Sequence, residues 1–224
     1  EGNTFPSDQY VVQSQLRFHS NHPNSDLIVL QPNDGSIVTT EYILDSIEKH
    51  GNEIATVLIG GVNYYSGQAF DMKAITSKAH KHDCFVGFAL AHAAGNINLK
   101  LHDWGVDFAT WCGYKYLNGG PGAPSGVFIH SRHLGKKNTP RFEGWWGHDK
   151  SSRFLMPNQF IPMKTAEAWQ LSNPPVMAMA PLLASLEIFH EVGMEDLIFK
   201  SRKLTNYLEK MILSRLSSKL KIIT

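Results

Sequence analysis

Short apolar runs alternate with longer segments of helical spacing along most of this chain, and this alternation limits the folds open to it. The helical segments are residues 39–49, with Thr39 placed as a cap, and residues 72–82. A further helix is expected over residues 10–18, capped by Ser7 or Asp8. The apolar runs occupy residues 27–30, 54–59, 84–90, 107–112 and 125–130. This order predicts an α/β domain with a mostly parallel sheet flanked by helices.

After residue 175 the spacing of apolar residues changes, and the short strand-like runs give way to long helical patterns. Residues 176–191 and 194–216 form two long amphipathic patterns separated by Gly193, which is suited to a helix C-cap. We therefore expect a large domain over residues 1–193 and, over residues 194–224, a helix that leads into a smaller C-terminal domain. The chain begins at Glu1 and ends inside an apolar run typical of a strand. These ends indicate a fragment, with the large domain incomplete at its N-terminus and the small domain truncated.

Composition excludes several classes of partner. The 224 residues carry a formal net charge of +1, which provides no electrostatic footprint for nucleic acid or an anionic membrane. No apolar run approaches the length of a bilayer span, and no signal peptide is evident, so we expect a cytoplasmic protein. Cys84 and Cys112 lack ligand-spaced partners, which favours free buried thiols over a disulfide or a metal site.

Three predicted strands end in small or polar residues. These ends are Gly60-Gly61 with Asn63, Ala91-His92, and Tyr114-Lys115. Ligands of open α/β sheets collect at the carboxyl ends of the strands, so a site is expected there. Lys115, between two tyrosines and before a glycine-rich turn, offers an amine that a pyridoxal cofactor could bind covalently; Tyr114 could contact its phosphate and Phe5 its ring. On spacing alone the site interpretation is weak, because a lysine after a strand is usually a solvated surface residue; Tyr114 would then be a half-buried strand-end tyrosine and His92 a polar turn histidine.

Longer motifs distinguish these alternatives. They are Phe5-Pro-Ser-Asp, Gly61-Val-Asn-Tyr-Tyr-Ser-Gly-Gln, Phe88-Ala-Leu-Ala-His-Ala-Ala-Gly-Asn, Leu101-His-Asp-Trp-Gly-Val-Asp-Phe-Ala, Tyr114-Lys-Tyr-Leu-Asn, Gly144-Trp-Trp-Gly-His and Leu171-Ser-Asn-Pro-Pro. In this order the chain resembles the kynureninases, fold-type I pyridoxal phosphate enzymes of the class V aminotransferase group. The resemblance implies the large domain of that fold. It also implies hydrolysis of L-kynurenine or its 3-hydroxy form to anthranilate or 3-hydroxyanthranilate and L-alanine, in tryptophan catabolism and pyridine nucleotide biosynthesis.

The resemblance also implies roles for individual residues. Lys115 would hold pyridoxal 5'-phosphate and move protons, assisted by Tyr114. The cofactor would further contact Phe5, Pro6, Ser7, Asp8, Gly60, His92, Trp145 and Asn173, and the substrate would contact His148, Ser172 and Asn173. Trp145 and Asn173 would reach the site from the second subunit of a homodimer. Taken singly, Trp145 also fits a core pair with Trp146, Asn173 a helix cap, and His148 a surface histidine. His80, His82, His130 and His133 are interpreted as structural or solvent-facing.

Two positions depart from the family pattern. Residue 89 is alanine, where the family has an aspartate that pairs with the pyridine nitrogen, and Gly60 replaces a serine. A charge-assisted hydrogen bond is worth about 1.5–3 kcal/mol, so its loss would weaken cofactor binding. An alternative hypothesis is therefore a catalytically impaired paralogue that serves as a dimerisation or scaffold protein. A related desulfurase or aminotransferase is a third, although neither cysteine is placed for a desulfurase.

Overall fold

A four-stranded mixed sheet forms the centre of the computed structural model, which describes residues 1–32, 37–136 and 139–222. The strands are β1 (Thr56–Gly60), β2 (Phe85–Ala89), β3 (Phe108–Trp111) and β4 (Gly126–Ile129), in the spatial order β1-β2-β3-β4. β1, β2 and β3 run parallel, and β4 is antiparallel to β3. The mostly parallel sheet expected from the sequence is confirmed, with each strand slightly shorter than its apolar run.

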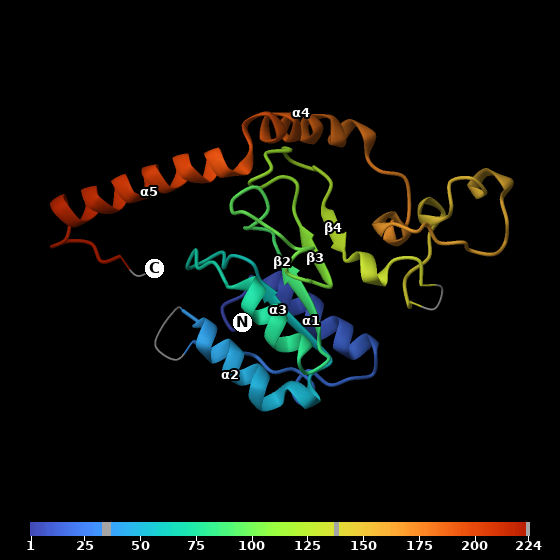
Figure 1. Cartoon of the computed structure of the whole chain (residues 1–224), viewed down its shortest axis with the longest axis horizontal. Coiled ribbons are helices and arrows are strands. Elements are labelled where there is room, and N and C mark those ends of the chain that lie inside the picture. The colour runs from blue at the N-terminus through green and yellow to red at the C-terminus, as the bar shows by residue number, and fades with distance from the viewer. Residues whose placement is uncertain (33–36, 137–138, 223–224) are drawn as a thin grey trace.

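Within the described residues, five α-helices accompany the sheet (Figure 1). They are α1 (Pro6–Phe18), α2 (Thr40–His50), α3 (Met72–His80), α4 (Val176–Val192) and α5 (Met194–Arg215). Short 3₁₀ helices occupy Gly51–Glu53, Ser131–His133, Trp145–Gly147, Arg153–Leu155 and Ala166–Trp169. α2 contacts α3, and α3 contacts β2. These three elements supply much of the core.

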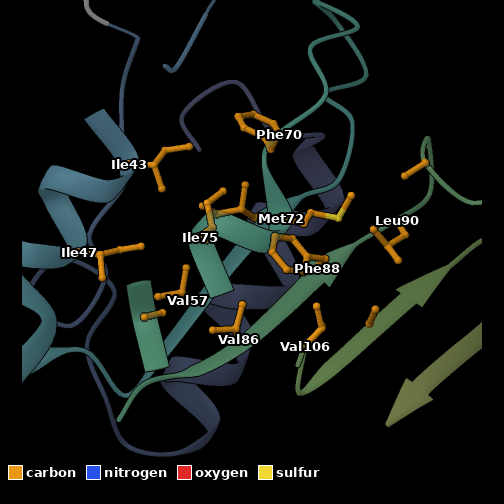
Figure 2. Packing of buried hydrophobic residues seen from close by; sticks show 14 of the residues in the cluster. Ile43, Ile47, Val57, Phe70, Met72, Ile75, Val86, Phe88, Leu90 and Val106 are labelled. Carbon is orange, nitrogen blue, oxygen red and sulfur yellow. The ribbon is translucent and has the colours of Figure 1, made fainter. Parts of the chain in front are cut away.

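The core lies between the sheet and the α2–α3 pair (Figure 2). Ile43 of α2 and Ile75 of α3 are fully buried, and Phe88 of β2 is among the largest fully buried side chains. Apolar residues at helical spacing in α2 and α3 thus meet a continuous apolar run in β2, as expected for a strand covered by helices. The burial of this central strand fixes the position of its carboxyl end.

Residues 27–30 do not form the strand that their apolar character predicts. The structure places them in extended chain outside the sheet, where the Gly2 amide donates to the Leu30 carbonyl over 2.7 Å. A strand requires a ladder of such bonds with a neighbour, and a short apolar run does not by itself supply one. Residues 220–222 likewise form no strand, and residues 223 and 224 lie outside the described part of the chain.

Helix caps follow the sequence in part. Thr39 accepts a hydrogen bond from the Tyr42 amide at 3.2 Å, as predicted for the start of α2. The predicted cap of α1 by Ser7 or Asp8 is wrong, because the helix begins at Pro6 with Phe5 in the cap position and no side-chain cap bond. Proline is favoured in the first turn because its missing N–H would have no partner there, so Ser7 and Asp8 lie inside the helix.

The last helix, α5, extends away from the sheet, whereas α4 lies across the loops at the end of the strands (Figure 1). α4 ends at Gly193, whose φ of 79° is a conformation that glycine adopts without strain, and α5 begins at the next residue. Neither helix contains a buried residue. Within the described residues no single helix has the length and apolar composition to cross a membrane, whereas α4 and α5 meet these two criteria only together, across a bend of 86°.

Candidate functional site

The turn after β3 presents Lys115 at the carboxyl edge of the sheet. It is closed by a hydrogen bond from the Gly119 amide to the Gly113 carbonyl at 2.9 Å and another from the Asn118 amide to the Lys115 carbonyl at 3.0 Å. A Cβ atom on Gly119 would lie 2.9 Å from that Gly113 oxygen and 3.2 Å from Leu182 of α4, so the turn requires glycine at this position. Lys115 is half-buried as a result.

The loop after β2 brings His92 to the same edge. The Ala93 amide donates to the Leu90 carbonyl at 2.9 Å, and the Asn96 side-chain amide donates to the His92 carbonyl at 3.0 Å. The imidazole Nε2 then lies 2.9 Å from Lys115 Nζ. The two groups that the sequence placed at neighbouring strand ends are therefore in direct contact.

The N-terminal segment contributes an aromatic ring and a carboxylate. Lys115 Nζ lies 5.6 Å from the centroid of the Phe5 ring, within cation–π range. Phe5 in turn packs edge-to-face on Tyr64 at 5.2 Å. Asp8, one turn into α1, accepts a hydrogen bond from the Thr4 hydroxyl at 3.4 Å. Phe5, Asp8, His92 and Lys115 thus form one cluster, as the sequence predicted.

Burial, together with neighbouring charges, shifts the pKa values of Asp8 and His92 in opposite directions. Burial raises the pKa of Asp8, and the nearby Glu1 carboxylate adds to this, while the Thr4 hydroxyl, Lys115 and His92 act against it. Burial also lowers the pKa of His92, reinforced by the positive charge of Lys115 and opposed by Asp8. His92 is consequently neutral at pH 7 and can accept a hydrogen bond from the lysine ammonium through Nε2.

A hollow of about 540 Å³ opens beside Lys115 and His92. Gly95, Tyr116 and Asn118 form part of its wall, and α4 and α5 supply Phe189 and Leu197. Its volume lies in the range of small-molecule sites. Phe189 and Leu197 could not be predicted from the sequence, because both occupy ordinary positions in amphipathic helices more than 70 residues from Lys115.

The remaining predicted cofactor residues lie around this cluster. Tyr114 is 53% exposed, its ring centroid is 5.9 Å from Lys115 Nζ, and the side chain of Cys112 raises the pKa of its hydroxyl. Pro6 and Ser7 form the exposed first turn of α1. Gly60 is the last residue of β1 and pairs with Ala89, the last residue of β2. Neither Gly60 nor Ala89 has a carboxylate side chain of its own.

Trp145, His148, Ser172 and Asn173 lie in a separate segment after β4. His148 is 4% exposed, and both ring nitrogens are engaged, Nε2 with the Ser152 hydroxyl at 3.0 Å and Nδ1 with the Ile161 amide at 3.1 Å. Trp145 packs edge-to-face on Phe154, while Ser172 and Asn173 are exposed. In the described part of the chain no hydrogen bond, ion pair or aromatic contact joins this segment to Lys115, His92 or Phe5.

At the opposite edge of the sheet, a buried carboxylate forms hydrogen bonds with two of the histidines. Asp107 accepts hydrogen bonds from the Val86 amide at 2.7 Å, from His80 at 2.9 Å and from His133 at 2.6 Å, and it pairs with Arg132. The interpretation of His80 and His133 as structural agrees with these contacts. Within the described residues no group of three or more His, Cys, Asp or Glu side chains is arranged to hold a metal ion.

Comparison with known proteins identifies the fold and the family of this chain. The fold is that of the large domain of fold-type I pyridoxal-phosphate-dependent transferases, as the sequence predicted: parallel strands flanked by helices, with a lysine turn at their carboxyl edge. The chain belongs to the aminotransferase class-V family, whose model matches residues 13–222. It is similar to an apo cysteine desulfurase from Thermococcus onnurineus, with a TM-score of 0.69 and 16% identity over 96% of this chain and 49% of that one. An alanine–glyoxylate aminotransferase from Nostoc gives a TM-score of 0.66 and 15% identity over 95% of this chain and 52% of that one. At such identity these two structures support the fold alone.

Curated proteins found by their sequences share a higher identity with this chain than these two structures do. A kynureninase from Myxococcus xanthus is 56% identical over 213 residues, which cover 95% of this chain and 50% of the relative. A kynureninase from Koribacter versatilis is 53% identical over 225 residues, covering 100% of this chain and 53% of the relative. The resemblance stated from the motifs is confirmed by these matches. The chain spans about half the length of the curated relatives it matches.

Proposed function

We propose that the full-length protein containing this chain is a kynureninase-type hydrolase that cleaves L-kynurenine or 3-hydroxy-L-kynurenine to anthranilate or 3-hydroxyanthranilate and L-alanine. The observation that carries the proposal is the contact of Lys115 Nζ with His92 Nε2 at 2.9 Å beside the Phe5 ring. Relatives named kynureninase at 53–56% identity support the same activity. Tryptophan catabolism and pyridine nucleotide biosynthesis, in the cytoplasm, are the corresponding context.

The cluster fits pyridoxal 5'-phosphate as its cofactor. A half-buried primary amine, an aromatic ring within 5.6 Å of it and an adjoining hollow of about 540 Å³ are the parts such a group requires. Lys115 would bind the cofactor aldehyde through Nζ, Phe5 would stack on its ring, and Tyr114, Pro6, Ser7, Asp8, Gly60 and His92 would surround it. When bound, the cofactor supplies an electron-accepting ring.

The chain's own residues would handle the protons. With cofactor and substrate bound, the free amine of Lys115 would be placed to take up the proton of the substrate α-carbon at Nζ. Neutral His92 can accept a hydrogen bond from that same Nζ, which holds the amine in place and stabilises its protonated form. The Phe5 ring lies on one side of the amine and is itself held edge-to-face by Tyr64.

We further propose a homodimer with shared active sites. Trp145, Ser172 and Asn173 are exposed and lie apart from Lys115 within one chain, so a second subunit would have to bring Trp145 and Asn173, together with the substrate residues His148 and Ser172, to the lysine. Exposed apolar side chains on α4, among them Met177, Leu183 and Ile188, offer additional surface for association. Sedimentation of the full-length protein at micromolar concentration is expected to give a dimer, and a monomer would refute shared sites.

The domain division remains part of the proposal. Residues 1–193 would belong to the cofactor-binding large domain and residues 194–224 to a helix leading into a small domain. The projection of α5 away from the sheet supports this division (Figure 1). Limited proteolysis of the full-length protein is expected to cut near Gly193 before it cuts within residues 56–129, because the sheet is buried and the helix junction is not.

One experiment tests the activity. Full-length protein is incubated with pyridoxal phosphate, and the visible absorption band of the lysine-bound cofactor is recorded before each kynurenine is added and the fluorescent product is measured. Lys115→Ala should lose the band and the product, whereas Lys100→Ala, at an exposed position away from the site, should retain both. A band without product would leave the catalytically impaired alternative suggested by Ala89. That alternative gains no support from the relatives above, which carry the enzyme's name.

A further inference from the structure

The Glu1 carboxylate lies beside the two strand ends that lack polar side chains. Its Oε2 accepts a hydrogen bond from the Gly60 amide at 3.2 Å, and its Oε1 accepts one from the Asn63 side-chain amide at 3.4 Å. Gly60 pairs with Ala89 across the sheet, and the Gly61 amide donates to the Ala89 carbonyl at 2.9 Å. Glu1 is therefore one strand away from the position where the acid is missing.

Glycine at residue 60 leaves the space that this carboxylate uses. A Cβ atom on Gly60 would lie 3.1 Å from Glu1 Oε1, which is closer than most real contacts of such an atom. A side chain at residue 60 would therefore press on the carboxylate or displace it. The two departures from the family pattern, Gly60 and Ala89, lie side by side and adjoin the same acid.

The segment that carries Glu1 is held in place by several bonds. Asn63 is buried, its Oδ1 accepts from the Tyr65 and Ser66 amides at 2.9 Å each, and its Nδ2 donates to the Asn3 carbonyl at 2.9 Å. The Gly2 amide is bonded to the Leu30 carbonyl at 2.7 Å. The carboxylate is thus positioned by a fixed loop after β1, and each oxygen retains a lone pair for a further donor.

The negative charge of Glu1 influences the pKa of a neighbouring residue of the site, Asp8. After burial, its proximity is the strongest of the influences that raise the pKa of Asp8, and the same Asp8 interacts with Lys115 and His92. Asp8 itself accepts a hydrogen bond from the Thr4 hydroxyl. Of these two acids, Glu1 is the one bonded at the end of β1, next to Ala89.

We infer that Glu1 supplies the negative charge for the cofactor's pyridine nitrogen that Ala89 cannot supply. This inference rests on the proposed function, because it assigns a partner within the same site. A carboxylate near that nitrogen favours its protonated form, and a charge-assisted hydrogen bond to it strengthens cofactor binding.

Glu1→Gln in the full-length protein is the direct test. Glutamine keeps the size and one accepting oxygen but removes the charge. Pyridoxal phosphate is titrated against the apoprotein by quenching of tryptophan fluorescence, and the visible band is followed against pH. We expect the dissociation constant to rise about ten-fold, equivalent to about 1.4 kcal/mol. Glu53→Gln, an exposed glutamate at the far end of the sheet, should leave the constant unchanged.

A second substitution separates lost charge from damaged structure. Ala89→Asp should restore cofactor affinity in the Glu1→Gln background and improve it much less in the wild-type background, since one carboxylate would then suffice. Equal gains in both backgrounds, or an unchanged constant in Glu1→Gln, would overturn the inference. Failure of Ala89→Asp to restore affinity to Glu1→Gln would also overturn it, because a general folding defect explains that result.

The test of the proposed function does not depend on the result for Glu1→Gln. If the wild-type protein forms the band and Lys115→Ala does not, the lysine assignment stands whatever Glu1→Gln does. If the wild-type protein forms no band, the proposed function fails, and the role of Glu1 fails with it.

Discussion

Lys115 Nζ and His92 Nε2 lie 2.9 Å apart although 23 residues separate them in the chain. The contact arises because β2 and β3 are parallel neighbours whose loops emerge at one edge of the sheet. With the lysine as donor, Nε2 must be the accepting nitrogen, so the imidazole proton resides on Nδ1. The neutral imidazole and the ammonium are compatible, whereas two cations at this distance would repel each other.

His92 should therefore make the stability of the protein depend on pH. Burial and then Lys115 lower its pKa in the folded protein below the ordinary value of about 6.5. The stabilisation that depends on neutral His92 is fully present above the unfolded-state value and is lost as the pH falls below about 6.5, because the unfolded chain then binds a proton that the folded chain rejects. Between pH 7.5 and pH 5, the free energy of unfolding from urea titrations should fall more for the wild type than for His92→Gln.

His190→Gln provides the control for this comparison. His190 is exposed on α4, so its replacement should leave the pH dependence of the wild type intact. Parallel curves for the wild type and His92→Gln would contradict the assignment of a neutral His92.

Asp107 is expected to stabilise the fold through its charge. Burial acts to raise its pKa, but hydrogen bonds from His80, Arg132 and His133 and from the Val86 amide outweigh burial and bring the pKa down to about 2. A shift of nearly two units corresponds to about 2 kcal/mol, present above the unfolded-state pKa and lost as the pH falls from about 4 through 2. Asp107→Asn should lower the free energy of unfolding at pH 7 by about 2 kcal/mol, because it removes the charge that pairs with Arg132 and one of the oxygens that accept hydrogen bonds from Val86, His80 and His133.

The matched control is Asp103→Asn, in the same loop. Asp103 is exposed, and its nearest cation partner, His102 Nδ1, is 3.7 Å away and also exposed. A change within about 0.5 kcal/mol is expected there. A small effect at Asp107 as well would mean that water replaces the carboxylate without cost.

The central strand offers a test of the core on one element. Phe88 is 1% exposed and lies in the buried cluster between the sheet and α3 (Figure 2), whereas Phe85 in the same strand is 53% exposed. Phe88→Ala should reduce the free energy of unfolding by about 3–5 kcal/mol, since it removes buried apolar area and leaves a cavity. Phe85→Ala should cost about 1 kcal/mol or less. Denaturant titration of both variants measures the difference, and equal losses would contradict the assigned faces of β2.

The sequence predicts those features that depend on neighbouring residues or on a general rule of topology. The cap at Thr39 is predictable because its hydroxyl accepts a hydrogen bond from the amide of Tyr42, only three residues away. The proximity of Lys115 and His92 is predictable because neighbouring parallel strands end at the same edge of the sheet. The strand predicted at residues 27–30 is wrong because a ladder partner is a tertiary property. The predicted cap by Ser7 or Asp8 is wrong because Pro6 already fits the first helical turn.

Long-range partners were beyond sequence reasoning for a physical reason. Phe189 and Leu197 reach the hollow only because α4 lies across the turn at Gly113 and Gly119, and nothing local to them records that crossing. Asp107 was visible only as part of a motif, because its partners His80 and Arg132 come from an earlier helix and a later turn. Glu1 could not be predicted as a site residue, because its partner is the backbone amide of Gly60 and no side-chain pattern indicates that contact.

Gly95 joins the two loops of the site and should not tolerate a side chain. Its φ is +79°, and a Cβ atom there would lie 3.0 Å from the Tyr116 carbonyl carbon and oxygen and 2.9 Å from Leu117. Gly122 has a similar φ of +78° but no atom within 4 Å of that position. Gly122→Ala should therefore cost only the backbone strain, about 1–2 kcal/mol.

Gly95→Ala should cost about 1 kcal/mol more than Gly122→Ala, because backbone cannot yield as a flexible side chain does. It should also weaken pyridoxal phosphate binding, since relief of the contact moves Tyr116, and with it Lys115, away from His92. Thermal unfolding of the apoprotein measures the first effect and fluorescence titration with the cofactor the second. Equal losses of stability in the two variants, with cofactor affinity retained in both, would show that the loops after β2 and β3 move independently and that the contact of Lys115 with His92 is not fixed by Gly95.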